Sequence, residues 1–217
     1  AYAERLVMPI RQELCEHLLP FWLSLSGEGQ PSIGLVDAER VRHPDAPRGL
    51  VYTSRMLWTY ASLCELPGLA EAYGLRQAAE RELELLRSVF YDREWGGYYL
   101  LCSADGEVLD ESKLIYAQCF VLYALAAWYR VAGGAEVLEE AQALYGLIEG
   151  CTRRLAGQVV HGEAYTRDYN SYSENLLAEQ TPGVELSLNQ TLHMIEAYTE
   201  LYRVWPDVGL RAALVRL

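Results

Sequence analysis

The sequence is poor in basic residues, and lysine is almost missing from it. Lys113 is the single lysine among 217 residues, and 30 acidic residues outnumber 18 basic ones, which leaves a net charge of −12. A nucleic-acid partner needs a basic surface against its phosphates, so this composition argues against such a partner. The acidic surplus predicts a well-solvated surface.

The sequence also has no run of 18 apolar residues, the length that a membrane-spanning helix requires. Residues 1–23 are charged and periodic, unlike a secretory signal peptide. We therefore expect no membrane partner, no signal peptide and a cytoplasmic location.

The five cysteines are odd in number and form no C-x-x-C pair, so a disulfide framework and a zinc site both have little support. We expect most of them to be reduced, semi-buried side chains; they are Cys15, Cys64, Cys102, Cys119 and Cys151.

Apolar residues are abundant at 51% of the chain, enough for one domain over residues 1–217 with a sizeable core. Residues 93–112, REWGGYYLLCSADGEVLDES, predict a small β-hairpin with a turn at Asp105-Gly106. Residues 25–48 and 160–186 are expected to be long loops at helix ends. Apolar periodicity, bounded by glycine and proline, predicts helices over residues 3–24, 49–66, 69–90, 113–132, 134–154, 187–204 and 207–217.

The predicted helices alternate in character. Those at 69–90 and 134–154 carry charged faces, which we interpret as solvated surface, whereas those that begin near 52, 113 and 187 are apolar almost all round. A helix that is apolar all round belongs inside a fold, so we expect outer and inner helices paired into part of a ring. Each inner helix has a polar residue near its start, namely Arg55, Tyr116 and Asn189, and His193 follows Asn189 by one turn. These side chains should share one mouth, where helix N-termini favour anionic oxygen.

Four ordered blocks carry a family resemblance: GLVYTSRMLWTYA, DREWGGYYLLCSADGEVLDESKLIYAQCFVLYALAAWYR, HGEAYTRDY and SLNQTLHMIEAYTELYRVWPD. Together they resemble the N-acylglucosamine 2-epimerase family, and within it most the cellobiose 2-epimerase branch. The resemblance implies an all-α fold, the (α/α)6 barrel or toroid of helical hairpins, with only its first six or seven helices in these 217 residues. It also implies cofactor-independent epimerisation or isomerisation of a reducing mono- or disaccharide.

The resemblance also implies site residues. The arginine of the family's second helix corresponds to Arg55, the tyrosine of its K-x-x-Y block to Tyr116, and its N-x-x-x-H block to Asn189 and His193. His193 and Arg55 would be catalytic, and Asn189 and Tyr116 would bind sugar hydroxyls. Trp58 is a candidate sugar-stacking platform.

Two features depart from the family pattern. Leu188 stands where methionine is common, and YTSR stands where NAR is more usual, which leaves the identity of the sugar open. The later histidines that serve the family as its acid/base pair have no counterpart here, because His17, His43 and His161 match no family site.

Epimerisation at C2 of an aldose requires ring opening, removal of the C2 proton and its return to the other face. The enediolate between these steps is the barrier, and positioned donors are its main stabilisation. Arg55 suits the developing oxyanion, and His193 would assist ring opening or stabilise the enediolate.

Several alternatives stay open. The chain could be a half-barrel that binds sugar without catalysis, an aldose–ketose isomerase of the same family, or a glycosidase, although no pair of carboxylates is evident at the mouth. A histidine on an apolar helix is often only a core residue, and Arg55 could be an ion-pair partner. His193 and Glu196 are spaced like a metal pair, but a third ligand is absent, so we expect no metal. Self-association through an exposed barrel edge is also expected.

Overall fold

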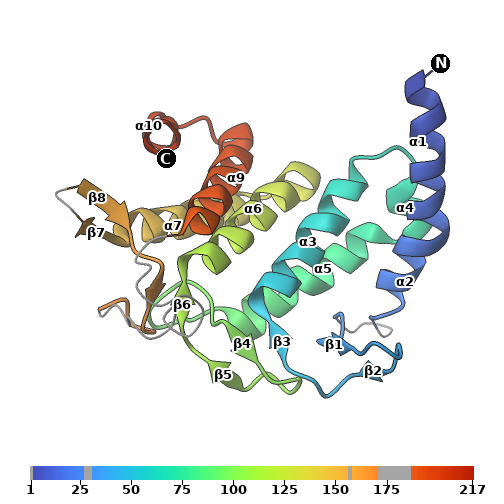
Figure 1. Ribbon diagram of the computed structural model, residues 1–217, viewed down its shortest axis with the longest axis horizontal. Helices are drawn as coiled ribbons and strands as arrows, with labels where there is room; N and C mark the ends of the chain where they lie inside the picture. Colours follow the sequence, from blue (N-terminus) through green and yellow to red (C-terminus); the bar gives the residue numbers. More distant parts are fainter. Residues whose placement is uncertain (1, 27–30, 156–157, 171–186) are drawn as a thin grey trace.

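The computed structural model describes residues 2–26, 31–155, 158–170 and 187–217. Its centre is a row of inner helices, α3 (Leu50–Cys64), α6 (Ile115–Ala132) and α9 (Leu188–Val204), with α6 packed against both of the others. Figure 1 shows these helices side by side in an arc. The predicted inner helices are confirmed, and so is the predominantly helical class.

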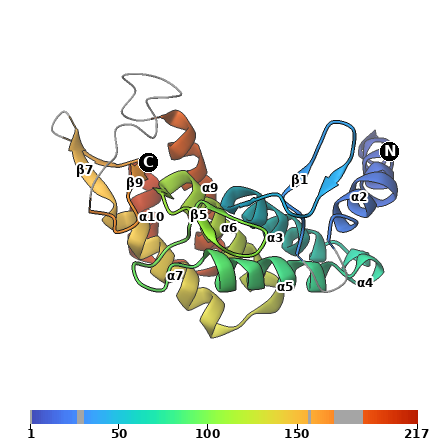
Figure 2. The same cartoon turned by 90° about the horizontal axis from the view of Figure 1, so that it is seen from below.

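A second layer of helices covers this row. The helix α5 (Leu75–Leu85) packs on α3, α7 (Ala135–Gly150) on α6, and α10 (Val208–Arg216) on α9. Figure 2 shows α5 and α7 on the same side of the inner helices. The N-terminal segment consists of α1 (Tyr2–Glu13), the π-helical turn η1 (Leu14–Leu18) and α2 (Leu19–Leu23). The outer–inner pairing expected from charge alternation is therefore confirmed.

Two predicted helices are wrong in their bounds. The helix expected over 69–90 breaks at Gly74, whose φ of 62° only glycine adopts at little cost, and this gives α4 (Leu69–Tyr73), α5 and the π-helical turn η2 (Leu86–Phe90). The helix expected over 134–154 ends at Gly150, and the chain continues as the strands β7 (Thr152–Leu155) and β8 (Gln158–His161).

The predicted hairpin in residues 93–112 is confirmed as β4 (Leu101–Cys102) and β5 (Val108–Asp110), with Gly106 at a φ of 89° in the turn. A third strand, β3 (Arg48–Gly49), joins β4 directly before α3. Likewise β6 (Lys113–Leu114) pairs with β9 (Ala164–Tyr165) directly before α6, so the helix predicted from 113 starts at 115. These strands hold the chain in place where two inner helices begin.

The two regions expected to be long loops also contain strands. Residues 25–48 include the hairpin of β1 (Leu35–Val36) and β2 (Arg42–His43), and residues 160–186 include β9. Residues 27–30 and 171–186 of these regions lie outside the described part of the chain.

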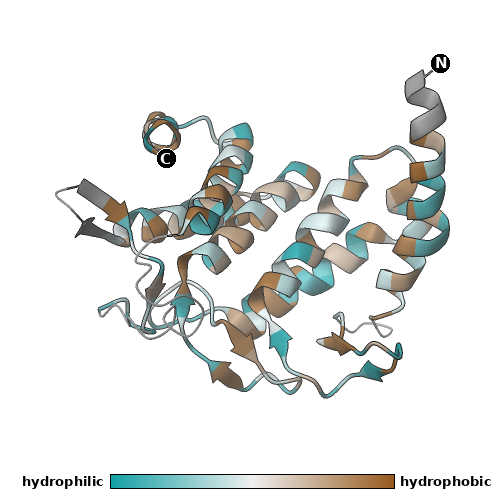
Figure 3. Cartoon of the chain, viewed as in Figure 1, coloured by the Kyte–Doolittle hydropathy of each residue, from teal (hydrophilic) through white to brown (hydrophobic). Residues whose placement is uncertain are grey.

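The core centres on α6. Within the described residues it is the one helix long and apolar enough to cross a membrane, with a mean hydropathy of 1.2 over its 18 residues, yet 67% of it is buried inside the fold. Figure 3 shows its brown, apolar positions within the row of inner helices. The helix α6 therefore has the burial of a core helix.

The five cysteines carry free thiols, of which Cys102, Cys119 and Cys151 are buried.

A buried ion cluster ties the loop after η2 to the start of α6. Lys113 and Asp92 are fully buried, and Lys113 Nζ lies 3.1 Å from Asp92 Oδ2. Arg167 donates from Nε to Asp92 Oδ2 at 2.9 Å and from Nη2 to Oδ1 at 3.1 Å. Burial alone would raise the pKa of Asp92, but the hydrogen bonds from Arg167 and Lys113 outweigh it and hold that pKa well below its usual range.

Arg87 and Arg130 make further ion pairs, and the pair of Arg87 corrects the interpretation of the charged faces at 69–90 and 134–154 as mere solvated surface. Arg87 of η2 donates twice to Glu140 Oε2 of α7, at 2.9 and 2.7 Å, so it joins two outer helices. Near the C-terminal ends of the inner helices, Arg130 of α6 donates to both oxygens of Glu65, at 3.1 and 2.9 Å, and also pairs with Glu200 of α9.

Replacing Asp92 tests the buried cluster. We expect Asp92→Asn to lower the free energy of unfolding at pH 7 by about 3 kcal/mol, because it leaves Lys113 buried without its counter-charge. The pKa of this carboxyl is lower in the folded chain than in the unfolded chain. Its stabilisation is therefore present above the unfolded pKa of roughly 4 and is lost as pH falls below it. Urea unfolding at pH 7 and pH 3 should show the gap between wild type and variant shrink in acid, whereas exposed Asp45→Asn should show no such gap.

Gly97 offers a second test, with a matched control in α7. Its φ is 66°, and a Cβ added there would overlap the hydroxyl of Tyr169. We expect Gly97→Ala to destabilise the fold by about 2–4 kcal/mol through backbone strain and overpacking. Gly146→Ala, where a Cβ meets nothing within 4 Å in a helix, should instead stabilise by about 0.5–1 kcal/mol. Equal urea midpoints for the two variants would contradict this.

Candidate functional site

Three of the predicted site residues come from the N-terminal halves of three different inner helices. Arg55 lies in the second turn of α3, Tyr116 in the first turn of α6 and His193 in the second turn of α9. They converge on Phe120 of α6, a residue that the sequence analysis missed.

Phe120 is the centre of this cluster. The Arg55 guanidinium carbon lies 4.6 Å from the centroid of its ring, and the His193 ring lies 4.5 Å away, centroid to centroid. Tyr116 completes the group, with its ring 6.2 Å from His193 and 6.4 Å from Phe120. A permanent positive charge and an imidazole therefore both contact one aromatic ring.

Trp58 extends this surface along α3. It stacks on Tyr123 of α6 with centroids 5.2 Å apart and planes 17° apart, and Tyr123 in turn lies 5.6 Å from Phe120. One face of the Trp58 indole is therefore already covered, and its role as a sugar platform stays a prediction. Tyr116, Phe120 and Tyr123 follow helical i, i+4, i+7 spacing, which is the signal that would have found the last two from sequence.

The tyrosines of the cluster are neutral at physiological pH. Burial raises the pKa of Tyr116, and it raises the pKa of Tyr123 to about 12 although Arg55 lies nearby. Both phenols can donate a hydrogen bond to a sugar oxygen, but neither can act as a base near pH 7.

His193 has a carboxylate partner on its own helix. Its Nδ1 lies 2.8 Å from Glu196 Oε2, one turn along α9. When Nδ1 carries the proton shared with Glu196, Nε2 is left to accept or pass a proton elsewhere. The pair therefore orients the imidazole and does not need a metal to do so.

Asn189 lies one turn before His193 on the same face of α9, as predicted, and its side chain is exposed. The start of this helix is capped by Ser187, whose Oγ accepts a hydrogen bond from the backbone N–H of Gln190 at 3.3 Å. The contact of Asn189 with a sugar stays a prediction.

The other histidines pair with carboxylates elsewhere in the fold. His17 Nδ1 lies 2.9 Å from Glu13, His43 Nε2 lies 2.8 Å from Asp37, and His161 Nε2 lies 3.0 Å from Glu149. In the part of the chain that the structure describes, no group of three or more His, Cys, Asp or Glu side chains could hold a metal ion. His193 is thus the histidine that contacts the Phe120 ring.

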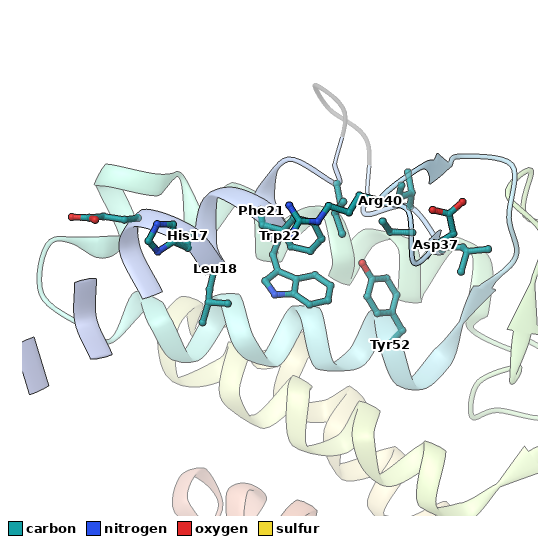
Figure 4. Close-up of a pocket in the computed structure, with 13 residues that line it drawn as sticks. His17, Leu18, Phe21, Trp22, Asp37, Arg40 and Tyr52 are labelled. Carbon is teal, nitrogen blue, oxygen red and sulfur yellow. The ribbon is translucent and has the colours of Figure 1, made fainter. Parts of the chain in front are cut away.

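A separate cavity of about 790 Å³ lies between α2, the β1–β2 hairpin and α3. Figure 4 shows Phe21, Trp22 and Tyr52 around this space, with the Arg40 side chain above it. Arg55, Tyr116 and His193 do not line it. The Phe120 cluster and this cavity are therefore distinct features of the chain.

The chain is similar to known proteins in both sequence and structure. The family model of N-acylglucosamine 2-epimerase (GlcNAc 2-epimerase) matches residues 35–202. The chain is 33% identical to a cellobiose 2-epimerase of Bacteroides fragilis, over 99% of this chain and 54% of that protein. It is 31% identical to a cellobiose 2-epimerase of Ruminococcus albus, over 91% of this chain and 50% of that protein. The solved structure of cellobiose 2-epimerase from Bacillus thermoamylovorans B4167 is similar at a TM-score of 0.90 and 34% identity, over 98% of this chain and 54% of that one.

The chain thus spans about half the length of the relatives that it matches. The match nevertheless covers most of the chain itself, and it includes the starts of all three inner helices. It confirms the resemblance carried by the four sequence blocks and the (α/α)-barrel class. The chain belongs to the N-acylglucosamine 2-epimerase family.

Proposed function

We propose that this chain forms the sugar-binding half of a cofactor-independent sugar 2-epimerase that acts on the reducing end of cellobiose or a related aldose. The observation that carries the proposal is the placement of Arg55 and His193 against the single ring of Phe120, at the N-terminal ends of the inner helices. The names of the relatives, which are cellobiose 2-epimerases, support the choice of substrate. The cytoplasmic location remains a prediction from composition.

The charge and protonation state of each side chain determine which step of the reaction it could assist. Removal of the C2 proton sends its electron pair toward C1 and leaves negative charge on the C1 oxygen of an enediolate. Arg55, always protonated, would stabilise that oxygen, while Tyr116 and Asn189 would donate to neighbouring hydroxyls. His193, oriented by Glu196, would move the proton between the ring oxygen and O1 during ring opening. Return of a proton to the other face of C2 completes the epimerisation.

The base that takes the C2 proton is not among these side chains. His17, His43 and His161 each pair with a carboxylate away from the Phe120 cluster, and the cluster tyrosines are neutral phenols. This observation favours a second candidate function, in which the 217-residue chain binds a saccharide but turns it over poorly by itself.

Binding is the first test. We expect Arg55→Ala to weaken the binding of cellobiose to this chain about tenfold or more, since a hydrogen bond from a charged group contributes about 1.5–3 kcal/mol. Arg203→Ala, which removes an exposed arginine paired with Glu200 farther along α9, should leave affinity unchanged. Calorimetric titration of the two variants measures both values. Equal affinities would remove Arg55 from the site.

Exchange of the C2 proton is the second test. In heavy water, we expect the chain to incorporate deuterium at C2 of cellobiose at least about 100-fold more slowly than the Bacteroides fragilis relative, because a positioned base supplies roughly 10²–10⁴-fold. His193→Ala should lower the remaining exchange further, with a smaller effect on binding. Proton NMR of the C2 position measures the rate. Exchange as fast as that of the relative would show that the base lies within these 217 residues.

A further inference from the structure

A short segment between the strands β8 and β9 contacts the starts of two inner helices at once. One of its two residues is Glu163, which is 4% exposed. The backbone oxygen of Glu163 accepts a hydrogen bond from the N–H of Ile115, the first residue of α6, at 2.9 Å. Its carboxylate Oε1 accepts a hydrogen bond from the N–H of Ser187, the N-cap residue of α9. One buried residue therefore joins two helix starts that are far apart in the sequence.

Both helices make further contacts with this segment. The strand β9 directly follows Glu163 and pairs with β6, the strand before α6, in the register of Ala164 with Leu114. On the side of α9, the buried Gln190 donates from Nε2 to the backbone oxygen of Gly162 at 3.2 Å. The segment is thus held by α6 on one side and by α9 on the other, and Glu163 makes a hydrogen bond to each.

These hydrogen bonds fix what apolar packing leaves free. The helices α6 and α9 lie side by side (Figure 1) and bury apolar side chains between them, an attraction that has no preferred direction. A hydrogen bond from a backbone N–H to a carboxylate is directional, and a buried carboxylate must keep its donors. Glu163 therefore determines how far α9 is shifted along α6.

This shift determines the geometry of the candidate site. Tyr116 lies in the first turn of α6 and His193 in the second turn of α9, and their rings are 6.2 Å apart. The ring of Phe120 lies 4.5 Å from that of His193. Arg55 comes from α3, whose start is held by the pairing of β3 with β4 instead. A displacement of α9 by about 1 Å is enough to lower the rate of a positioned reaction about 100-fold.

We propose that Glu163 is a positioning residue of the candidate site. It holds the start of α9 against the start of α6, and so places the His193 ring beside those of Tyr116 and Phe120. Its effect on the reaction passes through His193. The inference rests on the proposed function, because His193 has a reaction to assist only if the chain contributes to an epimerase site. The placement of His193 is nevertheless measurable without sugar.

Proton–carbon NMR of the histidine rings tests this placement in the full chain. The signal of His193 is assigned by its loss in His193→Ala. We expect Glu163→Ala to shift or broaden this signal, since the start of α9 loses its acceptor, while the signal of His17 in the distant η1 stays in place. Glu163→Gln, whose amide oxygen can still accept the N–H of Ser187, should keep the wild-type signal of His193.

Asp207→Ala is the matched control. Like Glu163, Asp207 accepts a backbone N–H at a helix start, that of Leu210 at 3.0 Å, but it does so in the outer helix α10. This variant should lose stability in urea and keep the His193 signal. If circular dichroism shows that Glu163→Ala does not fold, Gln190→Ala removes the other contact of α9 with the segment and should itself shift the signal.

Exchange at C2 of cellobiose links the placement to the reaction. We expect Glu163→Ala to lower the exchange rate about tenfold or more, and to lower cellobiose affinity less, because Arg55 stays in place. A folded Glu163→Ala with the wild-type His193 signal overturns the proposal, and so does a Glu163→Gln signal displaced as far as that of the alanine variant. If the wild-type chain does not bind cellobiose, the proposed function fails, whereas the His193 signal still shows whether Glu163 positions that histidine.

Discussion

The paired burial of Asp92 and Lys113 is the constraint on which the start of α6 depends. Neither charge can leave water without a partner, so the loop after η2 and the strand β6 must meet where the two side chains meet. Arg167 then brings the segment after β9 to the same carboxylate, and β9 pairs with β6. Because α6 begins directly after β6, the same cluster determines where Tyr116 stands.

The two ends of the inner helices are held by different kinds of contact. Near the C-terminal ends, Arg130 links Glu65 and Glu200 and so holds three helices together by charge. At the N-terminal ends the contacts are aromatic and cationic, and they bring an arginine and an imidazole to the ring of Phe120. The Arg130 ion pairs and the candidate site are thus separated by the length of the helices, so a change at Arg130 need not disturb the Phe120 cluster.

Apolar periodicity was enough to predict the inner helices, because a helix buried all round has little room for charge. The same periodicity located Arg55, Tyr116 and His193, since polar residues at the start of an otherwise apolar helix stand out. It failed where a single backbone angle decides the outcome, as at Gly74, whose left-handed conformation divides a predicted helix in two. Strands of two residues also escaped prediction, because alternation cannot be recognised over so short a span.

The sequence by itself determined the helical class, the order of inner and outer helices, and three residues of the candidate site, because each follows from spacing along one helix. Tertiary structure alone decided which residues from different helices meet. Phe120 reads from sequence as one more core aromatic, yet it receives Arg55 from α3 and His193 from α9. Lys113, the single lysine, has no sequence neighbour that predicts its partner, and it is buried against a carboxylate 21 positions away. Such contacts depend on how separate elements pack, and the residue pattern within one helix or strand does not predict that packing.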